Sequence, residues 1–143
     1  LKSIQFDHVI ANPPYFDRFK TTPAPDPSRE RSMGEQTPLK SWASVAAKRV
    51  KPKGYVHFIF RSERLPELLN ALPKELGSLR ILPFSARVGR ASELLILRAR
   101  KSGRAGFCLE APIVMHKGTE HTTDGDSYTD LISQVLRHGA QIE

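Results

Sequence analysis

Apolar and polar positions follow two different periods along the 143-residue chain, and each period predicts one kind of element. Short apolar or β-branched runs predict strands, whereas apolar residues three and four positions apart predict amphipathic helices. The predicted strands are Ile4–Ala11, Tyr55–Phe60, Leu79–Phe84, Glu93–Arg100 and a short apolar segment, Pro112–His116. The predicted helices are Pro38–Val50, Leu65–Leu76 and a last one with apolar positions at 131, 132, 135 and 136. Pro73 is expected to kink or shorten the second of these helices.

Capping and turn residues delimit these elements. Thr37 followed by Pro38 is typical of a helix start, and the Lys51–Gly54 segment predicts that helix's end. The expected N-caps of the two later helices are Ser62 and either Ser127 or Thr129. Residues 17–36 hold several prolines and many charges and show no hydrophobic period, which predicts a long loop.

The elements come in the order strand, helix, strand, helix, strand, strand. Alternating strands and helices are typical of an α/β fold with a mostly parallel sheet. Only about seven residues, Ser85–Ala91, join the last two strands, and a parallel crossover needs a dozen or more, so this pair should be antiparallel. We predict one α/β unit over residues 1–105 and a C-terminal extension over 106–143 with a short strand and a helix.

The composition is that of a folded protein, with 39% hydrophobic and 26% charged residues, which argues against a disordered or fibrous chain. No apolar run approaches the roughly 18 residues of a membrane span, and no signal-peptide pattern opens the chain. The single cysteine, Cys108, excludes an internal disulfide and a cysteine-rich zinc site. We expect a cytoplasmic protein without a membrane partner.

The charge is basic and unevenly distributed. The net charge is +7, and residues 1–105 hold 20 Lys and Arg against 9 Asp and Glu. A basic surface of this kind favours a polyanionic partner, nucleic acid first, although a generically basic soluble protein has the same charge. The charge therefore points to the first three quarters of the chain as the region that would contact such a partner.

The sequence Asn12-Pro13-Pro14-Tyr15 directly follows the first predicted strand. Ligands of open α/β sheets bind outside the carboxyl ends of the strands, and two prolines make a stiff turn there. The Asn12 side chain and the Pro13 carbonyl offer two acceptors, and the Tyr15 ring offers a flat face. Two acceptors on the N–H groups of a planar amine can pull it toward tetrahedral geometry, so that its lone pair points at an incoming methyl group.

This motif resembles the catalytic motif of class I S-adenosylmethionine-dependent methyltransferases that act on adenine N6 or glutamine N5. The chain as a whole resembles the C-terminal half of the bacterial family that methylates adenine N6 in valine tRNA, including Phe6-Asp7 before the strand and Phe16 after the motif. The resemblance implies S-adenosylmethionine as cofactor and tRNA as partner. It also implies a Rossmann-like sheet in the order 4-5-7-6, with the last strand, strand seven, antiparallel.

The departures from that family concern the cofactor. Its Gly-rich loop after the first strand and the acidic residue after the second have no counterpart here, and Gly103–Gly106 is better interpreted as a linker. The chain begins at Leu1 on what would be the fourth strand, so we expect the main cofactor-binding loop to lie in a missing N-terminal half, and this segment alone to be inactive. The open edge of Ile4–Ala11 then predicts an edge-to-edge homodimer or association with that missing half.

Further substrate-binding candidates carry positive charge or an aromatic ring. They are Phe16, Arg18, Lys20, Arg29 and Arg31 after the motif, and Arg87 and Arg90 between the last two strands of the sheet. The functional interpretation is contact with phosphates, and the alternative is a solvated charged surface. His116, His121, Asp124 and Asp126 match no tight metal-binding spacing, so no metal site is expected.

Three functions remain open on the sequence. The first is methylation of adenine N6 in tRNA, which the basic 1–105 segment favours. The second is the same chemistry on a glutamine side chain of a protein. The third is a non-catalytic half-domain that binds no S-adenosylmethionine.

Overall fold

A computed structural model describes residues 4–14, 38–119 and 127–142. The elements within these ranges are β1 (Phe6–Ala11), α2 (Leu39–Arg49), β2 (Val50–Arg61), a 3-10 turn (Ser62–Arg64), α3 (Leu65–Ala71), β3 (Leu76–Ser85), β4 (Ser92–Lys101), β5 (Cys108–Leu109), β6 (Ile113–Val114) and α4 (Asp130–His138). The predicted strands and helices are therefore all present, with boundaries shifted by a few residues.

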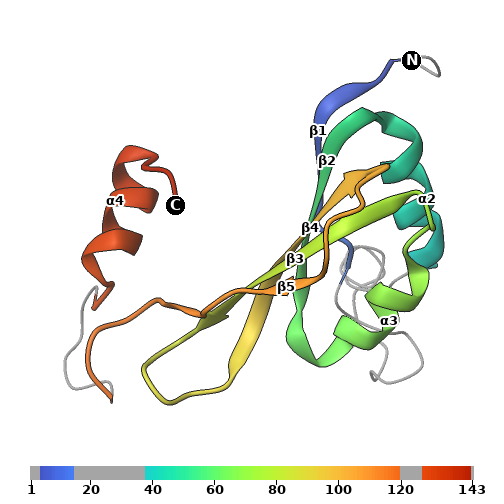
Figure 1. The fold of residues 1–143 in the computed structure, drawn as a ribbon. Coiled ribbons are helices and arrows are strands. Elements are labelled where there is room, and N and C mark those ends of the chain that lie inside the picture. The colour runs from blue at the N-terminus through green and yellow to red at the C-terminus, as the bar shows by residue number, and fades with distance from the viewer. Residues whose placement is uncertain (1–3, 15–37, 120–126, 143) are drawn as a thin grey trace, which may run out of the picture.

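The strands form one mixed sheet in the order β1-β2-β4-β3-β5, and β6 also pairs with β3 (Figure 1). β1 and β2 are parallel, whereas β4 is antiparallel to both of its neighbours, β2 and β3. The order β1-β2-β4-β3 is the predicted order 4-5-7-6, and the strand predicted to be antiparallel is β4. The predicted fold class, an α/β fold with this strand order, an antiparallel last strand and flanking helices, is confirmed.

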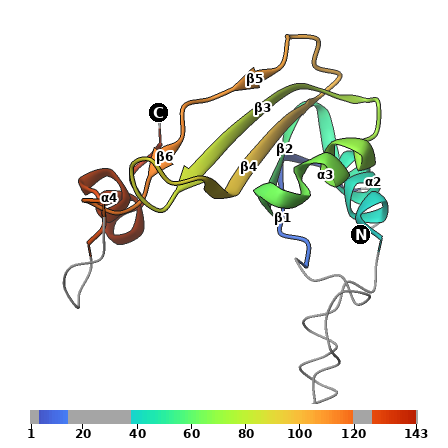
Figure 2. The same ribbon diagram turned by 90° about the horizontal axis from the view of Figure 1, so that it is seen from below.

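The core lies between the sheet and two helices. α2 and α3 cover one face of the sheet, while α4 lies at the far end on the other side (Figure 2). Alternate residues of β2, Val56, Phe58 and Phe60, are fully buried under the helices. α2 presents the small side chains of Ala43 and Ala46 to this core, which lets the helix approach the strands closely.

Two predicted helix boundaries were wrong. Leu76 was assigned to the helix after β2, but that helix ends at Ala71 ahead of Pro73, and Leu76 begins β3. Ser62 was expected to cap the helix, but it opens a 3-10 turn, and the residue before the first turn of α3 is Arg64. Pro66 lies in that first turn, where a missing N–H costs nothing.

The end of α2 also differs from the prediction. α2 ends at Arg49, and the Lys51–Gly54 segment belongs to β2, where the register with β1 shifts. Lys53 has a φ of 66°, and a Cβ on Gly54 would come within 2.7 Å of the Asp7 carbonyl oxygen. The segment is thus an irregularity inside the strand, and only glycine fits where β1 passes over it. Thr37, the expected cap of α2, lies outside the described residues.

The C-terminal segment extends the sheet beside β3 and ends in α4. The Thr129 hydroxyl accepts a hydrogen bond from the Ile132 N–H, and Gly139 follows the helix with a φ of 64°. Thr129 is one of the two N-caps that the sequence predicted, and glycine suits the left-handed backbone that ends the helix. His116 stacks on Tyr128 at 4.8 Å between ring centroids, which joins the two sides of the loop before α4.

β1 is an edge strand in the part of the chain that the structure describes. It pairs with β2, and its outward residues Phe6 and Ile10 are 50% and 72% exposed. Exposed apolar side chains on an edge strand are typical of a surface that another chain or segment covers. The predicted homodimer or association with a further polypeptide stays a prediction.

Candidate functional site

The Asn12-Pro13-Pro14 turn leaves the sheet at the carboxyl end of β1. Ala11, the last residue of β1, pairs with Phe58 of β2 and is buried. The side chains continue to alternate beyond the strand: Asn12 is exposed and Pro13 is fully buried. The Pro13 ring therefore anchors the turn in the core, while Asn12 faces the solvent at the edge where ligands of such sheets bind.

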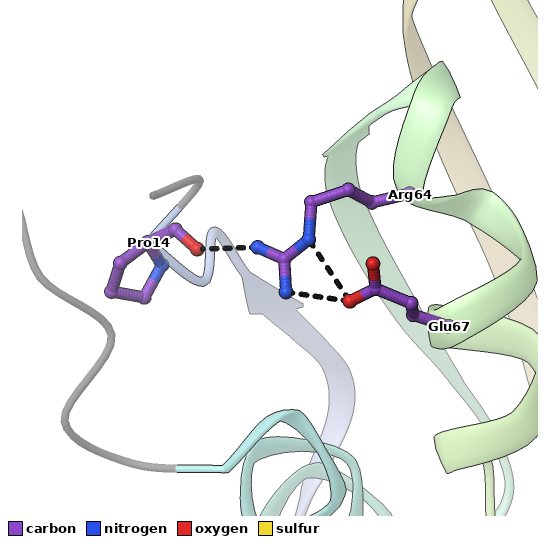
Figure 3. A network of polar contacts seen from close by, with 3 residues as sticks. All are labelled: Pro14, Arg64 and Glu67. Carbon is purple, nitrogen blue, oxygen red and sulfur yellow. Dashed lines mark hydrogen bonds and ion pairs between the residues drawn. The ribbon is translucent and has the colours of Figure 1, made fainter. Parts of the chain in front are cut away.

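Arg64 connects this turn to the start of α3 (Figure 3). Its Nη1 donates a hydrogen bond of 3.4 Å to the Pro14 carbonyl oxygen. Its Nε and Nη2 donate to Oε2 of Glu67 at 3.0 and 2.8 Å, and its guanidinium lies 5.3 Å from the Phe60 ring centroid. The carboxylate and the ring thus fix the guanidinium in one orientation, and the guanidinium in turn holds the Pro14 carbonyl.

This arrangement is partly shielded from water. The Arg64 side chain is only 13% exposed, so its pairing with Glu67 is stronger than that of an ordinary surface pair. Because Pro13 is buried on one side and the Pro14 carbonyl is held on the other, the two prolines have little freedom to change direction. The backbone of the turn is therefore fixed in direction by the fold itself.

Sequence reasoning missed Arg64 and Glu67. A signal for them exists: an arginine and a glutamate three residues apart directly follow the strand that neighbours β1. Neighbouring parallel strands end on the same side of the sheet, so residues that follow β2 lie near the residues that follow β1.

Among the residues that the structure describes, two buried side-chain polar atoms have no hydrogen-bond partner: Trp42 Nε1 and Ser62 Oγ. Trp42 packs against the core from α2. Ser62 directly follows β2, at the sheet edge that carries Asn12. A buried hydroxyl without a partner is unusual, and at this edge it is a group that a bound molecule can satisfy.

The structure places part of the predicted site. Asn12, Pro13 and Pro14 form the turn just described. The predicted residues Tyr15, Phe16, Arg18, Lys20, Arg29 and Arg31 lie outside the described residues. Their proposed roles in stacking and phosphate contact stay predictions.

Arg87 and Arg90 lie in the connection from β3 to β4. β3 runs in the same direction as β1, so this connection lies at the same end of the strands as Asn12. β2 and β4 lie between the two positions. The Arg87 guanidinium donates to the Lys117 carbonyl oxygen and, at 3.3 Å, to Ser127 Oγ. Arg87 thus holds the C-terminal segment, while Arg90 is exposed.

No group of three or more His, Cys, Asp or Glu side chains within the described ranges could hold a metal ion. His116 shares a hydrogen bond of 3.2 Å with Ser127 Oγ, while His121, Asp124 and Asp126 are outside those ranges. None of the helices that the structure describes is long and apolar enough to cross a membrane.

The described residues do not by themselves form a site for S-adenosylmethionine. In this part of the chain no glycine-rich turn lies between a parallel strand and a helix, the place where a nucleotide-binding loop is built. Gly103, in the predicted linker, packs against Ser78, whose Oγ a Cβ would approach to 2.4 Å.

The chain matches no protein-family model and no curated protein sequence. Among solved structures it is similar to a predicted O-methyltransferase, protein Atu636 from Agrobacterium tumefaciens, with a TM-score of 0.66 and 23% identity. That similarity covers 91% of this chain and 50% of the other, so the chain spans about half the length of that structure. It shows that the two proteins share a fold over this length.

The chain also has a weaker similarity to the crystal structure of a complex of M1.HpyAVI with SAM. The TM-score is 0.44 and the identity 12%, over 82% of this chain and 60% of the other. At this level the similarity adds nothing to the fold assignment.

Proposed function

We propose that the chain is the amine-binding part of an S-adenosylmethionine-dependent N-methyltransferase that acts on adenine N6 in tRNA. The observation that carries the proposal is the Asn12-Pro13-Pro14 turn at the carboxyl end of β1, held by the Arg64 contact to the Pro14 carbonyl. The fold shared with a predicted O-methyltransferase supports the reaction class. The basic charge of residues 1–105 supports a nucleic-acid substrate.

The chemistry of this part is positioning. S-adenosylmethionine supplies an electrophilic methyl group when it is bound. Oδ1 of Asn12 and the Pro13 carbonyl oxygen each accept a hydrogen bond from one N–H of the amine. These two hydrogen bonds weaken the delocalisation of the nitrogen lone pair into the ring. The lone pair is then directed out of the ring plane, and no strong general base is required for the transfer.

Glutamine is the second candidate substrate, because its side-chain amide is planar and carries the same two N–H groups. A half-domain without catalytic activity is the third, and it is favoured by the lack of a nucleotide-binding loop in the described ranges. Calorimetric titration of the 143-residue chain with S-adenosylmethionine distinguishes the third from the others. We expect weak or no binding by this chain alone and binding by the complete gene product.

The decisive experiment is methyl transfer from labelled S-adenosylmethionine by the complete gene product, with tRNA and a release factor as competing acceptors. We expect label on adenine of the tRNA. Asn12→Ala should abolish transfer and leave cofactor binding nearly unchanged, because it removes only an acceptor for the amine. Unchanged turnover in this variant, or label on the release factor alone, would contradict the proposal.

A further inference from the structure

A cluster of rings and positive charges lies on the sheet face that α2 and α3 do not cover. Two cross-strand rows form it: His8, Tyr55 and Arg100 pair across β1, β2 and β4, and His57 pairs with Arg98 in the next row. We call these five residues the cationic patch.

The patch is held together by contacts among its own members. His8 Nδ1 and His57 Nε2 share a hydrogen bond of 3.2 Å, so the two imidazoles are paired with each other. The His8 ring stacks on Tyr55 at 5.5 Å between centroids. Arg98 and Arg100 both lie over the Tyr55 ring, at 5.4 and 5.5 Å from its centroid.

The charge of the patch is not balanced within the part of the chain that the structure describes. Arg98 and Arg100 have no carboxylate partner there, and Arg98 pairs across strands with a third arginine, Arg80. Like charges directly opposite each other in a sheet are destabilising. Glu110, the acidic side chain lining the adjoining cavity of about 280 Å³, is already paired with Arg80 at 2.7 Å.

We propose that the cationic patch binds the backbone of single-stranded RNA. Guanidinium groups beside the exposed His8 ring and the half-buried Tyr55 and His57 rings suit phosphates and bases together. Positive charges that lie side by side without a carboxylate partner are relieved by a polyanion. His8 lies four residues before Asn12 on β1, which is about 13 Å along a strand. An RNA strand on the patch therefore extends the substrate contacts of the proposed function beyond the target base.

The test is the binding of an unstructured 20-nucleotide single-stranded RNA to the 143-residue chain, measured by fluorescence anisotropy over a series of salt concentrations. The double variant R98Q/R100Q should weaken binding roughly tenfold and make the slope of log affinity against log salt shallower by about 1.4, the value for two lost phosphate contacts. If this variant does not fold, as judged by circular dichroism, R98Q alone should change the slope by about 0.7.

The matched control is K40Q/K48Q, which removes the same charge from two exposed positions of α2, the helix on the opposite face of the sheet (Figure 2). Its affinity should fall far less than that of R98Q/R100Q. Equal losses in the two double variants, no RNA binding by the unaltered chain, or equally effective displacement of the RNA by polyglutamate would each overturn the proposal. Because the readout is binding, a chain that holds RNA through the patch while the complete gene product transfers no methyl group would refute only the proposed function.

Discussion

The two faces of the sheet are built from the same strands but serve different purposes. Along β2, Val56 and Phe58 are fully buried beneath α2 and α3, whereas the alternating residues Tyr55 and His57 lie half-buried on the other face. The covered face is almost wholly aliphatic and aromatic, and the uncovered face mixes rings, positive charges and exposed apolar side chains. The comparison indicates that the covered face supplies most of the stability of the fold, whereas the proposed contacts lie on the other face and at the strand ends.

The largest effect is expected from a substitution that creates a cavity beneath the covered face. Phe58→Ala removes a fully buried ring, and we expect a loss of about 3–5 kcal/mol in the free energy of unfolding. Ile59 follows Phe58 along β2, and its side chain lies on the uncovered face. Ile59→Ala should lower the free energy of unfolding by only about 1 kcal/mol, because that side chain is already half-exposed. Urea unfolding measures both, and equal losses would show that the second face is as tightly packed as the first.

The next test concerns the carboxyl end of β1, where Arg64 donates a hydrogen bond to the Pro14 carbonyl. Arg64→Ala should lower the kcat of the complete gene product about 100-fold, because a turn misplaced by about 1 Å no longer directs the amine at the methyl group. Global stability should fall by only about 1–2 kcal/mol. Steady-state kinetics beside thermal unfolding separate the two effects.

The conservative control is Glu67→Gln, which weakens the pairing but leaves the guanidinium in place. Its kcat should lie between those of the unaltered protein and Arg64→Ala. A kcat that is unchanged in Arg64→Ala would show that the buried Pro13 ring alone fixes the turn.

The sequence predicted the strands, the sheet order and the turn because each has a local signal. An apolar run stopped by Asn12 and two prolines marks both a strand and its end, and the short connection at Ser85–Ala91 required an antiparallel pair. The boundary at Leu76 was missed because a leucine at helical spacing looks the same whether the chain continues as helix or, after Pro73, as strand.

The contacts between elements could not be predicted in the same way. The hydrogen bond from Arg64 to Pro14 joins residues fifty positions apart, and the cationic patch depends on the register of three strands. A shift of one residue in that register would turn Tyr55 and His57 into the core. Such contacts are fixed by the packing of the whole sheet, and no local pattern reports them.

The smallest expected effect is a pH dependence that originates on the uncovered face. Burial, with His8 of β1 and Arg98 of β4 close by, lowers the pKa of His57 below its ordinary value of 6.5. When folding lowers the pKa of a histidine, the folded state is most stable at a pH above the pKa that this histidine has in the unfolded chain. That stability is lost as the pH falls through the pKa of the histidine in the folded state. We therefore expect stability to decline as the pH falls below about 6.5, the ordinary pKa of histidine.

His57→Phe keeps a ring at this position and removes the titrating group, so its stability should vary less over the same range than that of the unaltered chain. Thermal unfolding at several pH values measures the difference, and the effect is small because His57 is partly open to solvent. His8→Phe serves as the comparison, since it leaves the His57 imidazole beside Arg98 and so keeps part of the dependence. If His57→Phe and the unaltered chain lose stability in parallel as the pH falls, then the patch does not couple protonation to folding, and the two faces differ in packing alone.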